Sequence, residues 1–239
     1  MQYENTLVWF RRDLRDFDHA ALYHALKGSQ AVYCAFIFDI DILDKLTDKA
    51  DRRVEFIWES VRELKSALQA NGGDLIVQHG SARELIPALA LQLNVHAVFA
   101  NRDYEPNPVA RDAEVAATLA QNNIQFHDFK DHVLFEKDEV LSLAGKPYSV
   151  FTPYKNAHLK KLDDFYLKPY PVDVYSHNLA QIKPGELISL EDIGFTRTNV
   201  ADMRLPTGMS GGKQLFEDFE NRMDRYKDAR NFPAVKGVS

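Results

Sequence analysis

The sequence of 239 residues predicts a doubly wound α/β fold built on a five-stranded parallel sheet. Short apolar runs with little polar alternation are typical of strands that are buried on both faces of such a sheet. Segments with helical periodicity separate these runs, as expected when helices cover both faces. The predicted strands are Leu7–Phe10, Ala31–Phe38, Leu75–His79, Ala97–Asn101 and Ile124–Phe129.

The clearest helix is predicted for Asp51–Ala70, between the second and third strands. Its apolar residues recur at three- and four-residue spacing and are expected to form one stripe facing the sheet. That stripe consists of Val54, Ile57, Val61, Leu64 and Leu68. A capping box at Ser81–Glu84 predicts a second helix, and Pro87 predicts that this helix starts late or bends. A third helix is predicted from about Pro108 to Gln121, with proline in its first turn.

Composition and charge narrow the class of protein. The formal net charge is -6, which argues against the whole chain being a nucleic-acid-binding module, because phosphate binding needs a basic face. The one cysteine, Cys34, lies in an apolar run, so we expect a buried thiol and no disulfide within the chain. We find neither a leader-like N-terminus nor an apolar run of about 20 residues, and therefore expect a cytoplasmic protein without a membrane span.

The first strand runs directly into a charged loop. Its charged side chains are Arg11, Arg12, Asp13, Arg15 and Asp16. Loops at the carboxyl ends of parallel strands are where ligands bind in open α/β sheets. The alternative is a loop whose charges only pair internally and fix the turn. Asp18 is predicted to cap the next helix. The loop has no glycine, so the G-x-G-x-x-G fingerprint of an ordinary NAD or FAD site is missing.

Residues 9–22 read W-F-R-R-D-L-R-x-x-D-x-x-A-L and resemble the opening signature of the DNA photolyase/cryptochrome family. His19 stands where the family usually has asparagine. A second block, G-x-x-Y-x-V-F-T-P-Y at 145–154, resembles the end of the family's first domain. The final residues, Y-x-x-x-R-x-x-P-x-x-x-G-x-S at 226–239, resemble the start of its flavin-binding domain. The resemblance implies the N-terminal, antenna-binding α/β half of such a protein.

The resemblance also implies a division of the chain. Residues 1–163 would form the α/β domain, 164–208 an interdomain linker, and 209–239 the truncated start of a helical FAD-binding domain. The chain is therefore expected to be a fragment of a longer protein. The linker carries four prolines and several aromatic residues, so we expect it to lie against a surface. A last helix is predicted at Gly212–Lys227 and is expected to pair with a second copy of the chain. Its apolar face consists of Leu215, Phe219, Met223 and Tyr226.

The resemblance points to an antenna site after the fourth strand, where acidic and amide side chains suit the polar edge of a heteroaromatic chromophore. The predicted site consists of Asp39, Arg53, Asp103, Glu105 and Asn107. Family members suggest a deazaflavin or methenyltetrahydrofolate, and the alternative is that this fragment holds no antenna. Pro108 replaces the glutamate of folate-binding members, which favours a deazaflavin. The alternative is that Asp103 and Glu105 only anchor the loop through Arg102 or Arg111.

For the full-length protein, the resemblance implies a deoxyribodipyrimidine photo-lyase that uses FAD and light to split pyrimidine dimers in UV-damaged DNA. Tyr226 and Ser239 would belong to a partial FAD site. No catalytic residue and no metal site is predicted in this chain, and Trp9 and Trp58 are interpreted as packing residues. One alternative is a cryptochrome-type blue-light receptor. Another is a free-standing nucleotide-binding domain with a Rossmann-like sheet.

Overall fold

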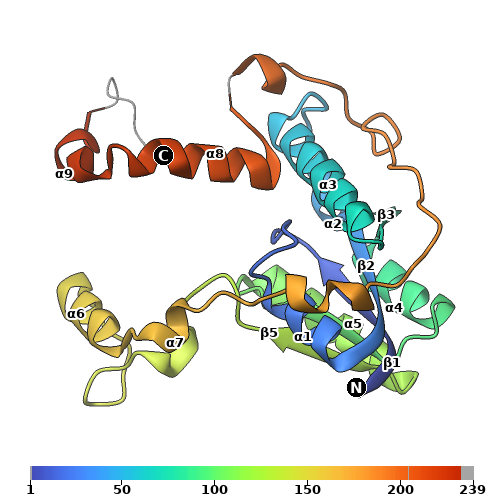
Figure 1. Ribbon diagram of the computed structural model, residues 1–239, viewed down its shortest axis with the longest axis horizontal. Coiled ribbons are helices and arrows are strands. Elements are labelled where there is room, and N and C mark those ends of the chain that lie inside the picture. The colour runs from blue at the N-terminus through green and yellow to red at the C-terminus, as the bar shows by residue number, and fades with distance from the viewer. Residues whose placement is uncertain (1, 204, 233–239) are drawn as a thin grey trace.

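A computed structural model describes residues 2–203 and 205–232. The described chain contains a five-stranded sheet in the order β3-β2-β1-β4-β5, and every neighbouring pair is parallel. This confirms the predicted doubly wound fold, with the order of strands reversing beside β1 (Figure 1). The strands are β1 (Tyr3–Phe10), β2 (Ser29–Asp39), β3 (Leu75–Gly80), β4 (Ala97–Asn101) and β5 (Gln125–Phe129).

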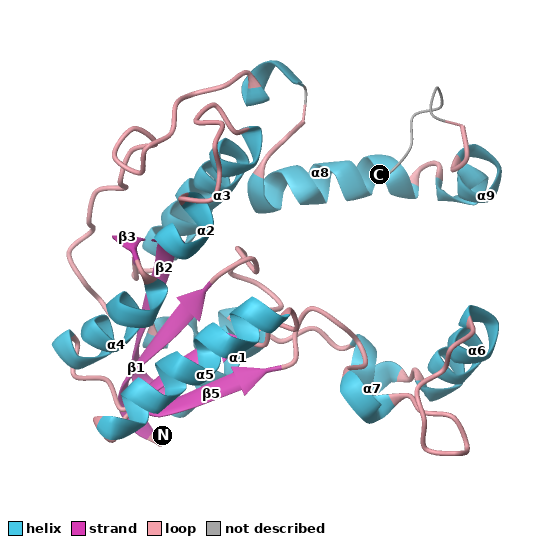
Figure 2. Ribbon diagram, turned by 180° about the vertical axis from the view of Figure 1, so that it is seen from behind, coloured by secondary structure: helices cyan, strands magenta, loops and turns pink. Residues whose placement is uncertain are grey.

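Helices cover both faces of the sheet (Figure 2). The helices of the described chain are α1 (Ala20–Gly28), α2 (Ile40–Leu43), α3 (Arg52–Ala70), α4 (Ala82–Gln92), α5 (Pro106–Gln121), α6 (Phe151–Lys161), α7 (Asp164–Leu167), α8 (Gly208–Glu220) and α9 (Tyr226–Ala229). Alternate residues of β1 point to opposite faces. Val8 and Phe10 pack into the core beneath α1 and α3, whereas Leu7 and Trp9 pack against α4 and α5. Cys34 is fully buried, as predicted.

The apolar stripe of α3 differs from the prediction at one position. Val54, Val61, Leu64 and Leu68 are buried, but Ile57 is 39% exposed, so the expectation that Ile57 faces the sheet was wrong. The N-terminal part of α3 lies beside the end of the sheet, and there Ile57 faces a cavity instead.

Two predicted caps were also wrong. The N-cap of α1 is His19, whose Nδ1 accepts from the Leu22 N–H at 3.1 Å. Asp18 instead adopts a positive φ of 44° and accepts a hydrogen bond from the Tyr170 N–H. Ser81 precedes α4 without forming a side-chain cap. The helix begins at Ala82 and includes the buried Pro87, so the predicted late start did not occur.

The segment after α7 packs along the α/β domain. The Ala180 N–H donates to the Val32 carbonyl at 2.9 Å, and the indole of Trp58 donates to the Ile188 carbonyl at 2.8 Å. Leu190 and Phe195 are almost fully buried in the core under α3. The segment therefore lies against the surface, as its aromatic and apolar residues suggested.

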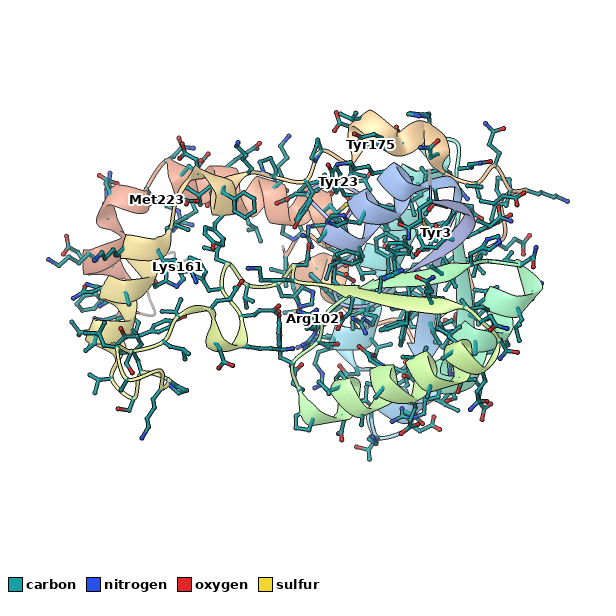
Figure 3. All side chains as sticks on the ribbon, turned by 90° about the horizontal axis from the view of Figure 1, so that it is seen from below. Tyr3, Tyr23, Arg102, Lys161, Tyr175 and Met223 are labelled. Carbon is teal, nitrogen blue, oxygen red and sulfur yellow. The ribbon has the colours of Figure 1, made fainter. Side chains whose placement is uncertain are left out.

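Two helical arms project from the sheet domain on the same side, α6–α7 and α8–α9 (Figure 1). Figure 3 shows Lys161 and Met223 out on these arms, whereas Tyr23 and Tyr175 lie together against the domain. Within the described residues, no helix is both long and apolar enough to cross a bilayer.

Candidate binding pocket at the carboxyl edge of the sheet

A cavity of about 1080 Å³ lies at the carboxyl ends of β1 and β2. The loop after β1, the start of α3 and the loop after β4 form its sides, and the first two turns of α8 line it as well. This is the edge at which the strand order reverses, where doubly wound sheets bind ligands.

The first turn of α8 is fixed close to α3. The Ser210 N–H donates to Glu63 Oε1 at 2.8 Å. Gly208 has a φ of +71°, and a Cβ atom there would overlap the Glu63 carboxylate. Because glycine has no Cβ and tolerates a positive φ, it allows this close approach. The position of α8 beside the cavity therefore depends on glycine at position 208.

The floor of the cavity is charged, and its charges are paired across loops. Arg12 donates to Asp103 at 3.0 Å and to Glu105 at 2.7 Å. The hydrogen bond from Arg12 lowers the pKa of Glu105 to about 2. Arg111 lies 3.7 Å from the second oxygen of Asp103. The side chain of Asp103 is only 5% exposed, so its carboxylate is held rigidly in the cavity floor.

A buried carboxylate–imidazole hydrogen bond fixes the loop after β1. Asp13 lies 3.0 Å from Nε2 of His19, and both side chains are essentially inaccessible. Asp13 also accepts from the Arg11 N–H at 2.8 Å and from Asn101 Nδ2 at 2.7 Å. Burial alone would raise the pKa of Asp13, but the hydrogen bonds from His19 and the Arg11 N–H and the nearby charge of Arg11 outweigh it, so the pKa is lowered. The ionised carboxylate thus ties β1, β4 and α1 together.

The walls of the cavity are apolar and unusually accessible. Phe17, Ile42 and Phe216 are each 55% exposed, and Ile57 is 39% exposed. Large side chains that are exposed together inside a concave site are typical of surfaces that a ligand covers. The cavity therefore combines a polar floor with apolar sides.

The structure brings two of the five predicted antenna residues into the cavity. Asp39 and Asp103 line it, and Glu105 lies nearby through its ion pair with Arg12. Asn107 is exposed and outside the lining, and so is Arg53, whose guanidinium pairs with Asp51.

The alternative was that Asp103 and Glu105 only anchor the loop through Arg102 or Arg111. The contacts agree with this alternative only in part. Arg111 does approach Asp103, but Arg102 pairs with Asp128 and Glu136 instead. Figure 3 shows Arg102 at the junction between the sheet domain and the segment that leads to α6. Anchoring by Arg111 and Arg12 leaves Asp103 facing the cavity.

Of the two residues predicted for a partial FAD site, the structure describes Tyr226, which lies outside the cavity lining. Tyr226 is 46% exposed at the start of α9, where its ring contacts Phe219. Ser239 lies outside the described residues.

Sequence reasoning missed several residues that line the cavity. Trp9 packs in the core, as predicted, but it also borders the cavity. Arg111 follows Pro108 by three residues on α5, and residues at this spacing lie on the same face of a helix. The spacing could therefore have predicted that both residues face the cavity. Met209 and Phe216 come from α8, and no local pattern predicts that this helix reaches the cavity.

One group of side chains in the described part of the chain has the spacing of a cation site. It consists of Asp13, Asp131 and His132. Both carboxylates are already engaged, Asp13 with His19 and Asp131 with Arg15 and the Ala20 N–H. We therefore assign no metal to it.

The fold and cavity define a doubly wound α/β domain with a ligand pocket at its switch point. The DNA photolyase family model matches residues 6–174, and the chain belongs to this family. It corresponds to the N-terminal domain, as the sequence motifs predicted.

Named relatives agree with this assignment. A deoxyribodipyrimidine photo-lyase of Synechococcus sp. is 34% identical over 98% of this chain and 49% of its own length. An uncharacterised 31.6 kDa protein of another Synechococcus strain is 32% identical over all of this chain and 83% of its length. The crystal structure of a class III photolyase from Agrobacterium tumefaciens superposes with a TM-score of 0.82 at 23% identity, over 99% of this chain and 49% of that one. The chain spans about half the length of the photolyases that it matches.

Proposed function

We propose that this chain is the light-harvesting half of a deoxyribodipyrimidine photo-lyase and that its cavity holds an antenna chromophore. The cavity is the observation that carries the proposal. A planar heteroaromatic ring system has apolar faces and a polar edge, which matches apolar walls above a charged floor. The volume of about 1080 Å³ is large enough for a three-ring chromophore.

The chain supplies three kinds of contact to such a ligand. Asp39 and Asp103 accept hydrogen bonds from ring N–H groups. Ile57 and Phe216 cover the ring faces and exclude water, while the ion pair with Arg12 holds the Asp103 carboxylate in position. When bound, the chromophore would absorb light and pass its excitation energy to a flavin.

We favour a deazaflavin over methenyltetrahydrofolate as the antenna. Asn107, the residue shared with folate-binding members, lies outside the cavity, whereas Pro108 lines it. The family also accommodates flavins, since an archaeal photolyase from Sulfolobus tokodaii is described with two FAD molecules, which imply a novel light-harvesting cofactor.

The remaining assignments follow from family membership. We propose that residues 1–163 form the antenna domain, 164–208 the linker and 209–239 the start of an FAD-binding domain that includes Tyr226 and Ser239. Catalytic FAD and UV-damaged DNA would bind in the half that the longer relatives possess. The single buried thiol of Cys34 is consistent with a cytoplasmic protein.

We further propose that the apolar face of α8–α9 pairs with a second copy of this chain. Leu215 is 42% exposed, and Met223 and Tyr226 are each 46% exposed. Light scattering at high concentration should show a dimer that the double variant Leu215→Lys, Met223→Lys abolishes. A monomeric wild-type chain would reject the pairing.

A chimera tests the photolyase assignment. This chain would replace the corresponding half of the Synechococcus photo-lyase, and light-dependent repair of a thymine-dimer oligonucleotide would be measured. We expect repair, with an action spectrum that includes the band of the added deazaflavin. A cryptochrome DASH of Gloeobacter violaceus is 28% identical over 97% of this chain, which supports the receptor alternative. A folded chimera that binds FAD and chromophore but does not repair would favour that alternative.

A further inference from the structure

Trp9 is the one readily oxidised aromatic side chain among the described residues that line the cavity. The chain contains 10 tyrosines and 2 tryptophans, but the described lining includes no tyrosine and no tryptophan besides Trp9. Indole and phenol rings give up an electron to a photoexcited heteroaromatic ring far more readily than a phenyl ring does. The other aromatic residues of the described lining are all phenylalanines, Phe17, Phe36, Phe38, Phe56 and Phe216. Trp9 therefore decides whether light absorbed in the cavity is kept or lost.

Two guanidinium groups lie close to the ring of Trp9. Cζ of Arg11 lies 4.9 Å from the ring centroid, and Cζ of Arg111 lies 4.7 Å from it. Their side chains are only 7% and 8% exposed. Asp112 accepts from both guanidinium groups, at 2.5 Å from Arg11 and 2.9 Å from Arg111. Burial and the shared carboxylate thus hold two cations beside one indole ring.

Positive charge beside the ring opposes the oxidation of Trp9. Loss of an electron would turn the indole into a radical cation, whose charge would lie about 5 Å from each guanidinium carbon. Trp9 is only 2% exposed, so water screens this repulsion weakly. The carboxylates of Asp112 and Asp103 offset part of the repulsion, but Asp103 is also paired with Arg12. One net positive charge at this distance slows the oxidation about 10- to 100-fold.

We propose that Arg11 and Arg111 suppress electron transfer from Trp9 to the excited chromophore, so that the cavity preserves the excitation energy. This inference rests on the proposed function, because it requires a chromophore in the cavity. An unshielded indole would give one electron to the excited ring, become a radical cation and take the electron back, and the light energy would be lost as heat. Electron transfer requires proximity and not solvent exposure, so burial of Trp9 does not prevent it. The two arginines act through Trp9 and make the cavity a site for harvesting light.

The test measures the fluorescence lifetime of riboflavin and of 8-hydroxy-5-deazariboflavin bound to the chain. Lifetimes would be read at saturation, so that differences in affinity do not enter. The proteins are the wild type, Trp9→Phe, Arg111→Met, the double variant Trp9→Phe, Arg111→Met, and Arg83→Met as a control. Arg83 also pairs with two carboxylates but lies outside the cavity lining.

We expect the lifetimes in the wild type, Trp9→Phe and Arg83→Met to agree within about twofold. The lifetime in Arg111→Met should be shorter by at least about fivefold, because the variant lacks one cation and leaves Asp112 and Asp103 with one counter-charge fewer. The double variant should recover the wild-type lifetime, because it lacks the electron donor.

An unchanged lifetime in Arg111→Met would overturn the inference and leave the chromophore pocket intact. A short lifetime that persists in the double variant would overturn it as well, since the quencher would then not be Trp9. So would a lifetime that lengthens more than about twofold in Trp9→Phe alone, since Trp9 would then quench despite the two arginines. Where Arg111→Met does not fold, Arg11→Met replaces it under the same criteria. Failure of the wild type to bind either probe would overturn the proposed function itself.

Discussion

Replacing Asp13 with alanine should destabilise the protein more than any exposed ion-pair substitution. Asp13 is fully buried, pairs with His19 at 3.0 Å and accepts from the Arg11 N–H and from Asn101. Removing this carboxylate leaves the buried donors of His19, Arg11 and Asn101 without an acceptor at about 1–3 kcal/mol each, so a loss of about 3–5 kcal/mol is expected. For a chain of this size, each kcal/mol lowers Tm by about 2–4 °C, so Asp13→Ala should lower Tm by about 6–20 °C.

The assay is thermal and urea denaturation of Asp13→Ala beside Glu114→Ala. Glu114 pairs with Arg83 on the surface, is 59% exposed and should contribute about 0–1 kcal/mol. Equal losses of stability in the two variants would refute the role given to the buried pair.

The same pair predicts a pH dependence with a definite sign. The pKa of Asp13 is lower in the folded state than in the unfolded chain, where an aspartate titrates near pH ~4. Its stabilisation is therefore complete above about pH 4 and is lost as the pH falls below that value. The difference in unfolding free energy between wild type and Asp13→Ala should narrow on acidification, and a difference independent of pH would contradict the argument.

Further variants test other parts of the structure. Gly211→Val would place Cβ 2.5 Å from the Pro206 carbonyl, so it should displace α8, lower Tm and speed proteolysis in that helix. Gly212→Ala meets open space and should raise stability by about 0.5–1 kcal/mol. Trp58→Phe removes the 2.8 Å hydrogen bond to Ile188 and should cost about 1–3 kcal/mol, with faster cleavage of the covering segment. Unchanged protease sensitivity in Trp58→Phe would show that this bond does not hold the segment.

Part of the site could be predicted from the sequence because its residues lie at or just after the ends of predicted strands. Asp39 ends β2 and Asp103 comes two residues after β4, and parallel strands place their carboxyl ends at one edge. Arg11 was noticed as a charge, but its ion pair with Asp112 joins two residues that are 101 positions apart in the sequence.

Other features depend on contacts that no local pattern encodes. Helix α8 reaches the cavity through Ser210 and Glu63, which are 147 positions apart. Aspartate is a common N-cap residue, but the carboxylate of Asp18 accepts a hydrogen bond from the Tyr170 N–H. The buried His19 caps α1 instead. In each case a tertiary contact replaced the local preference.

The central claim is that the cavity holds the antenna chromophore. Its most direct test compares chromophore binding by the wild type with binding by a variant whose cavity is blocked. Fluorescence titration with 8-hydroxy-5-deazariboflavin would compare the wild-type chain with Ile57→Trp, which fills the cavity from α3, and with Leu91→Trp on the outer side of α4. We predict saturable one-to-one binding to the wild type and to Leu91→Trp, and at least a tenfold loss of affinity in Ile57→Trp. Equal binding to all three proteins would show that the chromophore does not occupy this cavity.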